Sequence, residues 1–137
     1  MKRVFTTGVF DLFHVGHLNF LRRARMLGDQ LIVGVNTDEF VFSYKQKKPI
    51  IPYAQRQEIV RACRFVDLTV KAEDFLPIKY LIDLEIDVMA VSSSWKDQDL
   101  KSFEFASKNN IKIEFIEYSD FISTTQITND ILRQHSK

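Results

Sequence analysis

The chain has 137 residues, and its 19 basic and 18 acidic side chains give a formal net charge of +1. This balance argues against a nucleic-acid or membrane-surface binder, because such proteins usually carry a basic excess. No apolar run reaches membrane-spanning length. The single cysteine, Cys63, excludes an intrachain disulfide framework and fits a reducing compartment. We expect one domain over residues 1–137, in the cytoplasm, with neither nucleic acid nor membrane as a partner.

Short apolar runs alternate with amphipathic segments, which is typical of βαβ units around a parallel sheet. The expected elements, in chain order, are strand Arg3–Thr7, helix Gly16–Leu27, strand Gln30–Val35, helix Tyr53–Arg64, strand Leu68–Lys71, helix Pro77–Leu84, strand Val88–Ser92, helix Asp99–Asn109, strand Lys112–Ile116 and helix Thr124–Gln134. Gly28 stands where a stop of the first helix is expected. The lysine- and proline-containing segment Ser43–Pro52 predicts a loop. The fold class is α/β: a single Rossmann-like domain with a five-stranded parallel sheet flanked by helices.

The junction between the first predicted strand and the first predicted helix points to a phosphate site. It runs from Thr6 to His17 and reads TTGVFDLFHVGH. Ligands of parallel α/β sheets bind beyond the carboxyl ends of the strands, and a helix N-terminus favours an anion there. His14 and His17 lie at this helix start, where imidazolium groups would stabilise charge that develops at phosphorus. Gly16, between them, lets the backbone approach a ligand closely.

The histidine pair has a second interpretation as half of a metal site. The only other histidine is His135, near the C-terminus, and no HExxH motif is present. No cysteine cluster completes a zinc set either. The phosphate interpretation is therefore preferred, and we predict no side chains dedicated to a metal.

The segment GVFDLFHVGH, residues 8–17, resembles the HxGH signature of the nucleotidyltransferase superfamily, which includes cytidylyltransferases and several adenylyltransferases. The resemblance continues through LGDQLIVGVNTDEF at 27–40, KQKKP at 45–49, YAQRQEIV at 53–60, RFVDLTV at 64–70 and ISTT at 122–125. It covers nearly the whole chain and is closest to the glycerol-3-phosphate cytidylyltransferases.

The resemblance implies a role for each matching residue. The expected catalytic residues are His14, His17 and Lys45, with the histidines holding the α-phosphate. The expected nucleotide-binding residues are Thr6, Thr7, Gly8, Phe10, Gly16, Arg56, Ser123, Thr124 and Thr125. The residues expected on the acceptor side are Lys47, Asp11, Asp38 and Trp95. Asp11 and Asp38 are also candidates for ordering the loops around the site. Several of these residues have a simpler interpretation as well: solvated lysines, a solvated Arg56, and a plain helix N-cap within the Ser123-Thr124-Thr125 cluster.

The resemblance further implies transfer of CMP from CTP to a small phosphorylated acceptor, a polyol phosphate or phosphonate, with release of pyrophosphate. Mg²⁺ is the expected cofactor, bridging phosphate oxygens, and Asp11 is a candidate for helping to place it. A homodimer is expected, because Arg64 and Asp67 match a stretch that lies at a dimer interface in cytidylyltransferases. Two alternatives remain open. One is an adenylyltransferase acting on a sugar phosphate or flavin mononucleotide, and the other is a nucleotide-binding module without turnover.

The chain departs from the glycerol-3-phosphate cytidylyltransferase pattern at two places. Ser92-Ser93-Ser94-Trp95 stands where that family typically has Gly-Asp-Asp-Trp, and the residues 118–121 lack an expected arginine. These changes predict a remodelled end of the pocket, with an acceptor other than plain glycerol 3-phosphate or an unusual handling of glycerol 3-phosphate. The alternative is sequence drift, with Lys47 or Arg56 supplying the lost charge.

Overall fold

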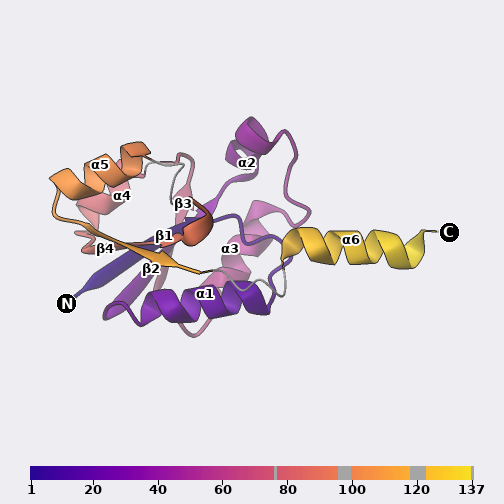
Figure 1. The fold of residues 1–137 in the computed structure, drawn as a ribbon, viewed down its shortest axis with the longest axis horizontal. Coiled ribbons are helices and arrows are strands. Elements are labelled where there is room, and N and C mark those ends of the chain that lie inside the picture. Colours follow the sequence, from indigo (N-terminus) through magenta and orange to yellow (C-terminus); the bar gives the residue numbers. More distant parts are fainter. Residues whose placement is uncertain (76, 96–99, 118–122, 137) are drawn as a thin grey trace.

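A five-stranded sheet forms the centre of the protein. The computed structural model describes residues 1–75, 77–95, 100–117 and 123–136. All neighbouring strands run parallel, in the order β3-β2-β1-β4-β5 (Figure 1). The strands are β1 (Arg3–Gly8), β2 (Gln30–Asn36), β3 (Leu68–Ala72), β4 (Val88–Ser92) and β5 (Lys112–Ile116). The predicted α/β fold with a five-stranded parallel sheet is confirmed.

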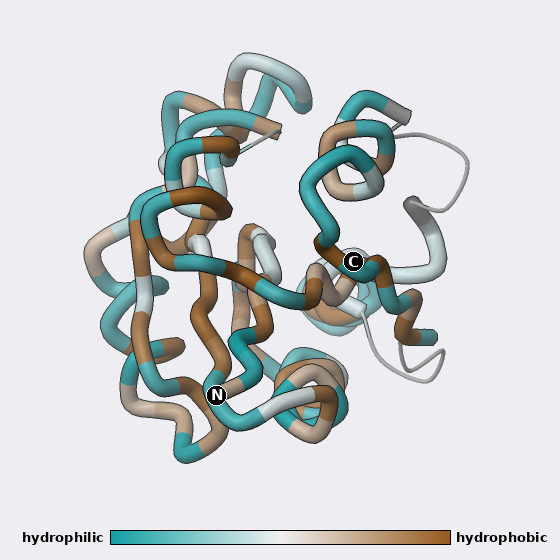
Figure 2. The backbone as a smooth tube through the Cα atoms, turned by 90° about the vertical axis from the view of Figure 1, so that its left-hand side faces the viewer, coloured by the Kyte–Doolittle hydropathy of each residue, from teal (hydrophilic) through white to brown (hydrophobic). Residues whose placement is uncertain are grey.

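Helices cover both faces of this sheet. One face packs against α1 (Val15–Arg25) and α3 (Tyr53–Ala62), and the other packs against α4 (Ile78–Asp83) and α5 (Leu100–Lys108). Adjacent residues of a strand point to opposite faces, so Val4 belongs to the first apolar cluster and Phe5 to the second. Both side chains are fully buried, as expected for a central strand covered on both faces. Figure 2 shows the apolar strand segments in the interior of the molecule.

The strand order reverses between β1 and β4. The chain passes from β1 to β2 to β3 toward one edge of the sheet, then returns to β4 beside β1 and continues to β5. Such a reversal leaves a crevice at the carboxyl ends of the two central strands, which is where open α/β sheets bind ligands.

The structure corrects the prediction of a loop over Ser43–Pro52. Helix α2 spans Asp38–Lys45, so the segment is helical as far as Lys45. Thr37 caps this helix, because its Oγ1 accepts a hydrogen bond from the Phe40 N–H at 3.1 Å. The helix ends at Gln46, which adopts a left-handed conformation with φ 58°. The two prolines and three lysines of this segment favoured a loop, but its first residues belong to a short helix that begins at the Thr37 cap. A 3-10 turn over Ser93–Trp95 was also not predicted.

The other predicted helices are present, with described ends within two residues of those expected; Asp99, the expected start of α5, lies outside the described residues. The first helix ends before Gly28, with Met26 as its C-cap in an ordinary right-handed conformation. Gly28 has a different reason to be glycine. A Cβ there would lie 2.7 Å from the Lys2 carbonyl oxygen, so the close approach of two backbone segments requires it.

Helix α6 (Thr124–His135) projects away from the sheet and carries the C-terminus (Figure 1). None of its residues is buried. Among the residues that the structure describes, no helix is both long and apolar enough to cross a membrane.

Candidate active site

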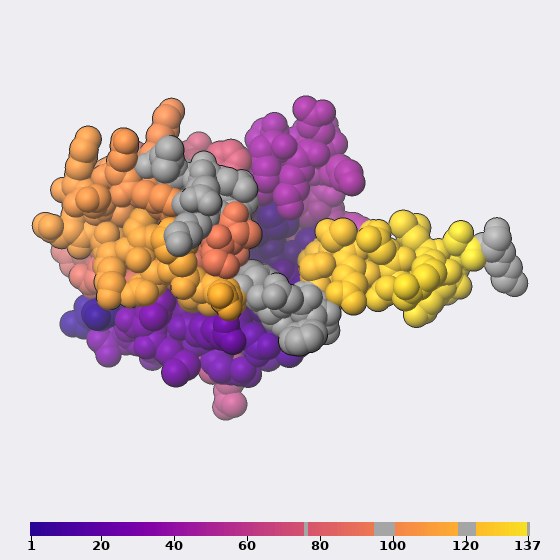
Figure 3. Space-filling view, in the orientation of Figure 1, coloured from indigo at the N-terminus to yellow at the C-terminus, as the bar shows by residue number. Residues whose placement is uncertain are grey.

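A cavity of about 600 Å³ opens at the carboxyl ends of the central strands. Figure 3 shows it as a hollow between α2, the start of α6 and the β4 side of the molecule, with β1 at its floor. Its described lining includes Thr6, Thr7, Gly8, Val9, Phe10, Asp11, His17, Phe20, Asn36, Phe40, Val41, Tyr44, Lys45, Lys47, Lys48, Pro49, Ile50, Asp74, Phe75, Met89, Ala90, Val91, Ser92, Ser94, Thr124, Thr125 and Thr128. The cavity therefore lies at the strand reversal, where the topology predicts a ligand.

The loop from β1 to α1 is held in an unusual backbone conformation. Phe10 and Leu12 both lie in the left-handed region, with φ 55° and 50°. Each such non-glycine residue costs about 1–3 kcal/mol, so the surrounding contacts must fix the loop. Phe10 is 4% exposed, and Gly8 leaves room for its ring, since a Cβ at Gly8 would lie 2.8 Å from it. The loop therefore presents a fixed backbone to the cavity.

His14 and His17 form a reciprocal cap at the start of α1. The Gly16 N–H donates to His14 Nδ1 at 3.0 Å, and the His14 N–H donates to His17 Nδ1 at 3.1 Å. The two rings stack with their centroids 3.9 Å apart. Because each Nδ1 accepts a hydrogen bond, a neutral ring carries its proton on Nε2. The backbone thus fixes the same tautomer in both histidines.

Burial favours the neutral form of both imidazoles. It lowers the pKa of His14, and burial together with the nearby His14 lowers the pKa of His17 to about 3. His17 is 6% exposed and also contacts the rings of Phe10 and Phe13. Burial therefore disfavours the imidazolium form expected from the sequence, most strongly at His17.

Asp11 orders Ile50 and Ile51, which follow Lys45, Lys47 and Lys48 in the chain. Its carboxylate accepts the N–H groups of Ile50 and Ile51 at 2.8 and 2.9 Å, and also that of Leu12 at 3.1 Å. These bonds tie residues 9–14 between β1 and α1, the phosphate loop, to Ile50 and Ile51. These two residues follow Lys45, Lys47 and Lys48, which all line the cavity. The expected loop-ordering role of Asp11 is confirmed.

Arg56 performs a similar task from α3. It is 1% exposed, and its guanidinium donates to the carbonyl oxygens of Ile51 at 2.8 Å and Val9 at 2.6 Å, and to Asp38 Oδ1 at 2.7 Å. Asp38 also accepts the Tyr53 N–H at 3.3 Å, so its predicted loop-ordering role is confirmed as well. All three kinds of guanidinium nitrogen have protein partners here, and neither Arg56 nor Asp38 lines the cavity.

The start of α6 forms another part of the wall. Thr124 and Thr125 line the cavity, whereas Ser123 does not and caps the helix through an acceptor bond from the Gln126 N–H at 3.0 Å. Thr124 Oγ1 donates to the Asp11 carbonyl oxygen at 2.8 Å, which joins this helix to the phosphate loop. Only Ser123 and the threonines of the ISTT motif can be placed, because Ile122 lies outside the described residues.

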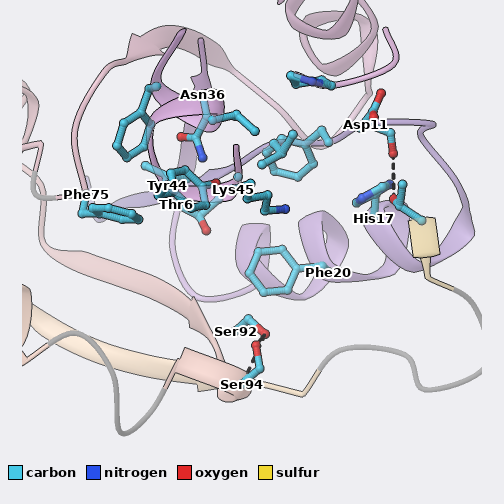
Figure 4. Close-up of a pocket in the computed structure, with 18 of the residues that line it drawn as sticks. Thr6, Asp11, His17, Phe20, Asn36, Tyr44, Lys45, Phe75, Ser92 and Ser94 are labelled. Carbon is cyan, nitrogen blue, oxygen red and sulfur yellow. Dashed lines mark hydrogen bonds between the residues drawn. The ribbon is translucent and has the colours of Figure 1, made fainter. Parts of the chain in front are cut away.

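The β1 and β4 strand ends complete the floor. Thr6 is buried and its hydroxyl donates to the Ala90 carbonyl oxygen at 2.7 Å, while Thr7 is exposed to the cavity. Ser92 and Ser94 face each other with their hydroxyl oxygens 2.9 Å apart (Figure 4). Trp95 ends the 3-10 turn, but its side chain lies outside the described structure, as do residues 118–121.

The remaining expected residues come from several segments, and the structure brings most of the predicted site together at one cavity. Gly8, Phe10, His17, Lys45 and Lys47 all line the cavity. His14 and Gly16 are not among the lining residues, but they hold His17 through the cap described above. The sequence interpretation missed an aromatic wall formed by Phe40, Tyr44 and Phe75, and the buried Asn36 beside it. Asn36 is the last residue of the apolar strand β2, and its position at the carboxyl end was the available signal.

The fold and this site together define an α/β protein whose HxGH segment lies beside a cavity at the carboxyl ends of the central strands. The cytidylyltransferase-like family model matches residues 5–130. The chain belongs to the cytidylyltransferase-like family, as the resemblance predicted.

The family assignment agrees with individual relatives. The chain is 37% identical over 132 residues to glycerol-3-phosphate cytidylyltransferase of Bacillus subtilis (strain 168), covering 96% of this chain and 98% of that protein. It is also 35% identical over 135 residues to the bifunctional protein HldE of Citrifermentans bemidjiense. This match covers 98% of this chain but only 28% of HldE. A crystal structure of the lipopolysaccharide core biosynthesis protein of Thermoplasma volcanium superposes with a TM-score of 0.73 at 26% identity, covering 89% of this chain and 99% of that one.

Proposed function

We propose that the protein transfers CMP from CTP to a small polyol phosphate and releases pyrophosphate. The observation that carries this proposal is the reciprocal His14–His17 cap, which aligns two imidazoles of fixed tautomer at a helix N-terminus beside the cavity. Support comes from the family and from a relative named glycerol-3-phosphate cytidylyltransferase, 98% of which is covered by this chain. The chemistry is also suitable, because helix N–H groups and imidazole donors stabilise charge on phosphate oxygens.

In the proposed reaction, an oxygen of the acceptor phosphate attacks the α-phosphorus of CTP. A new P–O bond forms in line with the bond to the β-phosphate oxygen, which breaks, and the bonding electrons leave with pyrophosphate. A phosphate monoester is largely ionised near neutral pH, so no general base is required. The protein contributes positioning and charge stabilisation: the histidines at the α-phosphate, and the three lysines Lys45, Lys47 and Lys48 around the substrate phosphates.

Mg²⁺ is proposed to enter with the triphosphate. Among the described residues there is no group of three or more His, Cys, Asp or Glu side chains placed to hold a metal. Both oxygens of Asp11 already accept backbone N–H groups, so this carboxylate is poorly suited to direct coordination. Mg²⁺ commonly binds through substrate phosphates and water, where it would neutralise phosphate charge. The residues therefore fit a metal that belongs to the CTP complex rather than one held in a protein cage.

A homodimer and a cytoplasmic location are also proposed. Support for the dimer is the likeness of residues 64–70 to an interface segment and the exposure of Leu68, 42%, on the edge strand β3. Asp67 itself pairs with Arg25 at 3.3 Å and accepts the Leu31 N–H, which is a local role. Sedimentation at micromolar concentration tests the dimer, and a monomeric mass would contradict it. The single cysteine supports a reducing compartment.

The test of the proposed activity is pyrophosphate release from CTP with a panel of polyol phosphates, with the cytidine-containing product identified by ³¹P NMR. ATP replaces CTP in a parallel series, and a His14→Ala/His17→Ala variant serves as the inactive control. Activity with CTP that is lost in the control supports the proposal. Preference for ATP would assign the protein to adenylyl transfer, and release from neither nucleotide would reject the transferase function.

A further inference from the structure

Rings from three described residues contact the imidazole of His17. The His14 ring lies nearly parallel to it, with an interplanar angle of 29° and a centroid distance of 3.9 Å. The Phe13 ring is also nearly parallel, at 27° and 5.3 Å, whereas the Phe10 ring meets it at 61° and 5.6 Å. Aromatic contacts have preferred geometries, so these rings restrain the plane of the imidazole. No step of the proposed reaction uses Phe13.

The hydrogen bond within the cap does not fix that plane. It holds one atom of the ring, because the His14 N–H donates to His17 Nδ1 at 3.1 Å. The last side-chain torsion of histidine is broad, so the ring is still able to turn about this atom and carry Nε2 with it. Direction matters at a reacting phosphate, where a misplacement of about 1 Å costs roughly a hundredfold in rate. Packing against the faces of the imidazole has to supply the remaining restraint.

The backbone holds Phe13 in a suitable place. It immediately precedes the N-cap of α1, where a hydrophobic residue often packs onto the first turn of the helix. Leu12 before it is left-handed, with φ 50°, and His14 after it is extended, with φ −138°. The Asp11 carboxylate accepts the Leu12 N–H at 3.1 Å and so holds this turn. The Phe13 ring also packs against the first apolar cluster, which fixes it from below.

We propose that Phe13 is a positioning residue for the reaction: its ring holds the plane of the His17 imidazole so that Nε2 is aimed at the substrate phosphate. The inference rests on the proposed function. Within the described part of the chain, His17 lines the cavity and Phe13 does not (Figure 4). Phe13 therefore acts through His17 and not on a substrate. Its loss should slow the chemical step and leave the binding of CTP nearly unchanged.

Phe13→Leu tests the inference, because leucine is apolar but has no flat ring to stack on the imidazole. Pyrophosphate release is measured from CTP with glycerol 3-phosphate as acceptor. We expect kcat to fall about tenfold, with the KM for CTP within about twofold of the wild-type value. Phe13→Tyr keeps the ring at a partly buried position, so its kcat should stay within about twofold of the wild type. Phe13→Met repeats the test of Phe13→Leu should that variant fail to fold.

The ¹⁵N NMR signals of the His17 ring give a second measurement that needs no turnover. The wild type should show one tautomer, with the proton on Nε2, because Nδ1 accepts the His14 N–H. In Phe13→Leu the ring turns away from this bond, so the two nitrogen signals should approach each other as both tautomers become populated. Phe103→Leu is the matched control. Its ring meets that of Phe115 at 5.4 Å outside the cavity lining, and its loss should change neither kcat nor the tautomer.

Two groups of outcomes are distinguishable. A wild-type kcat and a single tautomer in Phe13→Leu, equal losses in Phe13→Leu and Phe13→Tyr, or a raised KM with unchanged kcat would overturn the inference and leave cytidylyl transfer intact. No pyrophosphate release from the wild-type protein would overturn the proposed function, and the catalytic role of Phe13 with it.

Discussion

Helices α1 and α6 begin at the same cavity, but the rest of the protein holds them very differently. Helix α1 buries one side against the sheet through Gly16, His17, Phe20, Leu21 and Ala24. Helix α6 has no buried residue, and its described hydrogen bond to the phosphate loop is the one from Thr124 to Asp11. Electrostatic stabilisation needs donors that are fixed before the reaction. We therefore expect α1 to carry the rate of the chemical step and α6 to contribute mainly to binding of the triphosphate.

The largest expected effect is on the α1 side. His17→Ala should lower kcat by at least about a hundredfold at saturating CTP, because it removes a fixed donor from the reacting phosphate. Thermal unfolding checks that the variant is folded. His135→Ala, on the exposed end of α6, is the control and should retain normal turnover. A near-normal kcat in His17→Ala would contradict the expectation that α1 carries the rate of the chemical step.

Arg56→Lys tests the support behind the α1 loop. Lysine keeps the charge but cannot reproduce the bonds to Val9, Ile51 and Asp38 together. Unfolding in urea should show a loss of about 2–3 kcal/mol, with a lower kcat and a smaller change in the KM for CTP. Arg133→Lys, in the exposed pair with Asp130 on α6, should have almost no effect on stability. If Arg56 instead contacts substrate phosphate, KM would rise strongly while stability stayed unchanged.

The pH dependence of stability gives a smaller signal from the same helix. The folded-state pKa of His17 is below its ordinary value of 6.5, near 3, so the unfolded chain binds the proton more readily. Its contribution is complete above pH 6.5 and is lost as the pH falls toward 3. Between these values, one such group changes the unfolding free energy by about 1.4 kcal/mol per pH unit. His17→Asn should flatten this slope in urea titrations from pH 7 to 5, and an unchanged slope would show that His17 is not buried as a neutral ring.

The smallest effect is expected at α6. Thr124→Val removes the hydrogen bond to the Asp11 carbonyl oxygen, which is worth about 1 kcal/mol. The KM for CTP should rise a few-fold with kcat nearly unchanged. Ser123→Ala, which removes only the helix cap, separates helix stability from the contact across the cavity. A loss of kcat as large as that of His17→Ala would show that α6 is as important to the chemical step as α1.

Site residues were predictable from the sequence where their contacts are local in the chain, and not where their partners are distant. The HxGH segment was recognisable because its loop and helix are contiguous in the chain, and the pattern itself sets the cap between His14 and His17. Arg56 was expected at a phosphate, whereas its partners Val9 and Asp38 lie 47 and 18 residues away along the chain. No local pattern distinguishes a buried guanidinium from one that faces a ligand, since only packing decides its partners.

The aromatic wall was missed for a related reason. Phe40 and Tyr44 share α2, a helix hidden within an apparent loop, and Phe75 reaches them only through the return of the chain after β3. An aromatic residue in any one of these segments is equally suited to the core. Their meeting at a cavity is a property of the tertiary structure.

The sequence by itself determined the alternation of strands and helices, the parallel sheet and the phosphate loop, because each depends on period, turn residues or a contiguous motif. Tertiary structure decided that burial lowers the pKa of His17 and so favours its neutral form. It also decided that Asp11 and Arg56 hydrogen-bond to backbone groups distant in the chain. It also decided that Asn36 meets an aromatic wall. These properties arise where segments remote in the chain share one low-dielectric space, and local patterns do not record which segments those are.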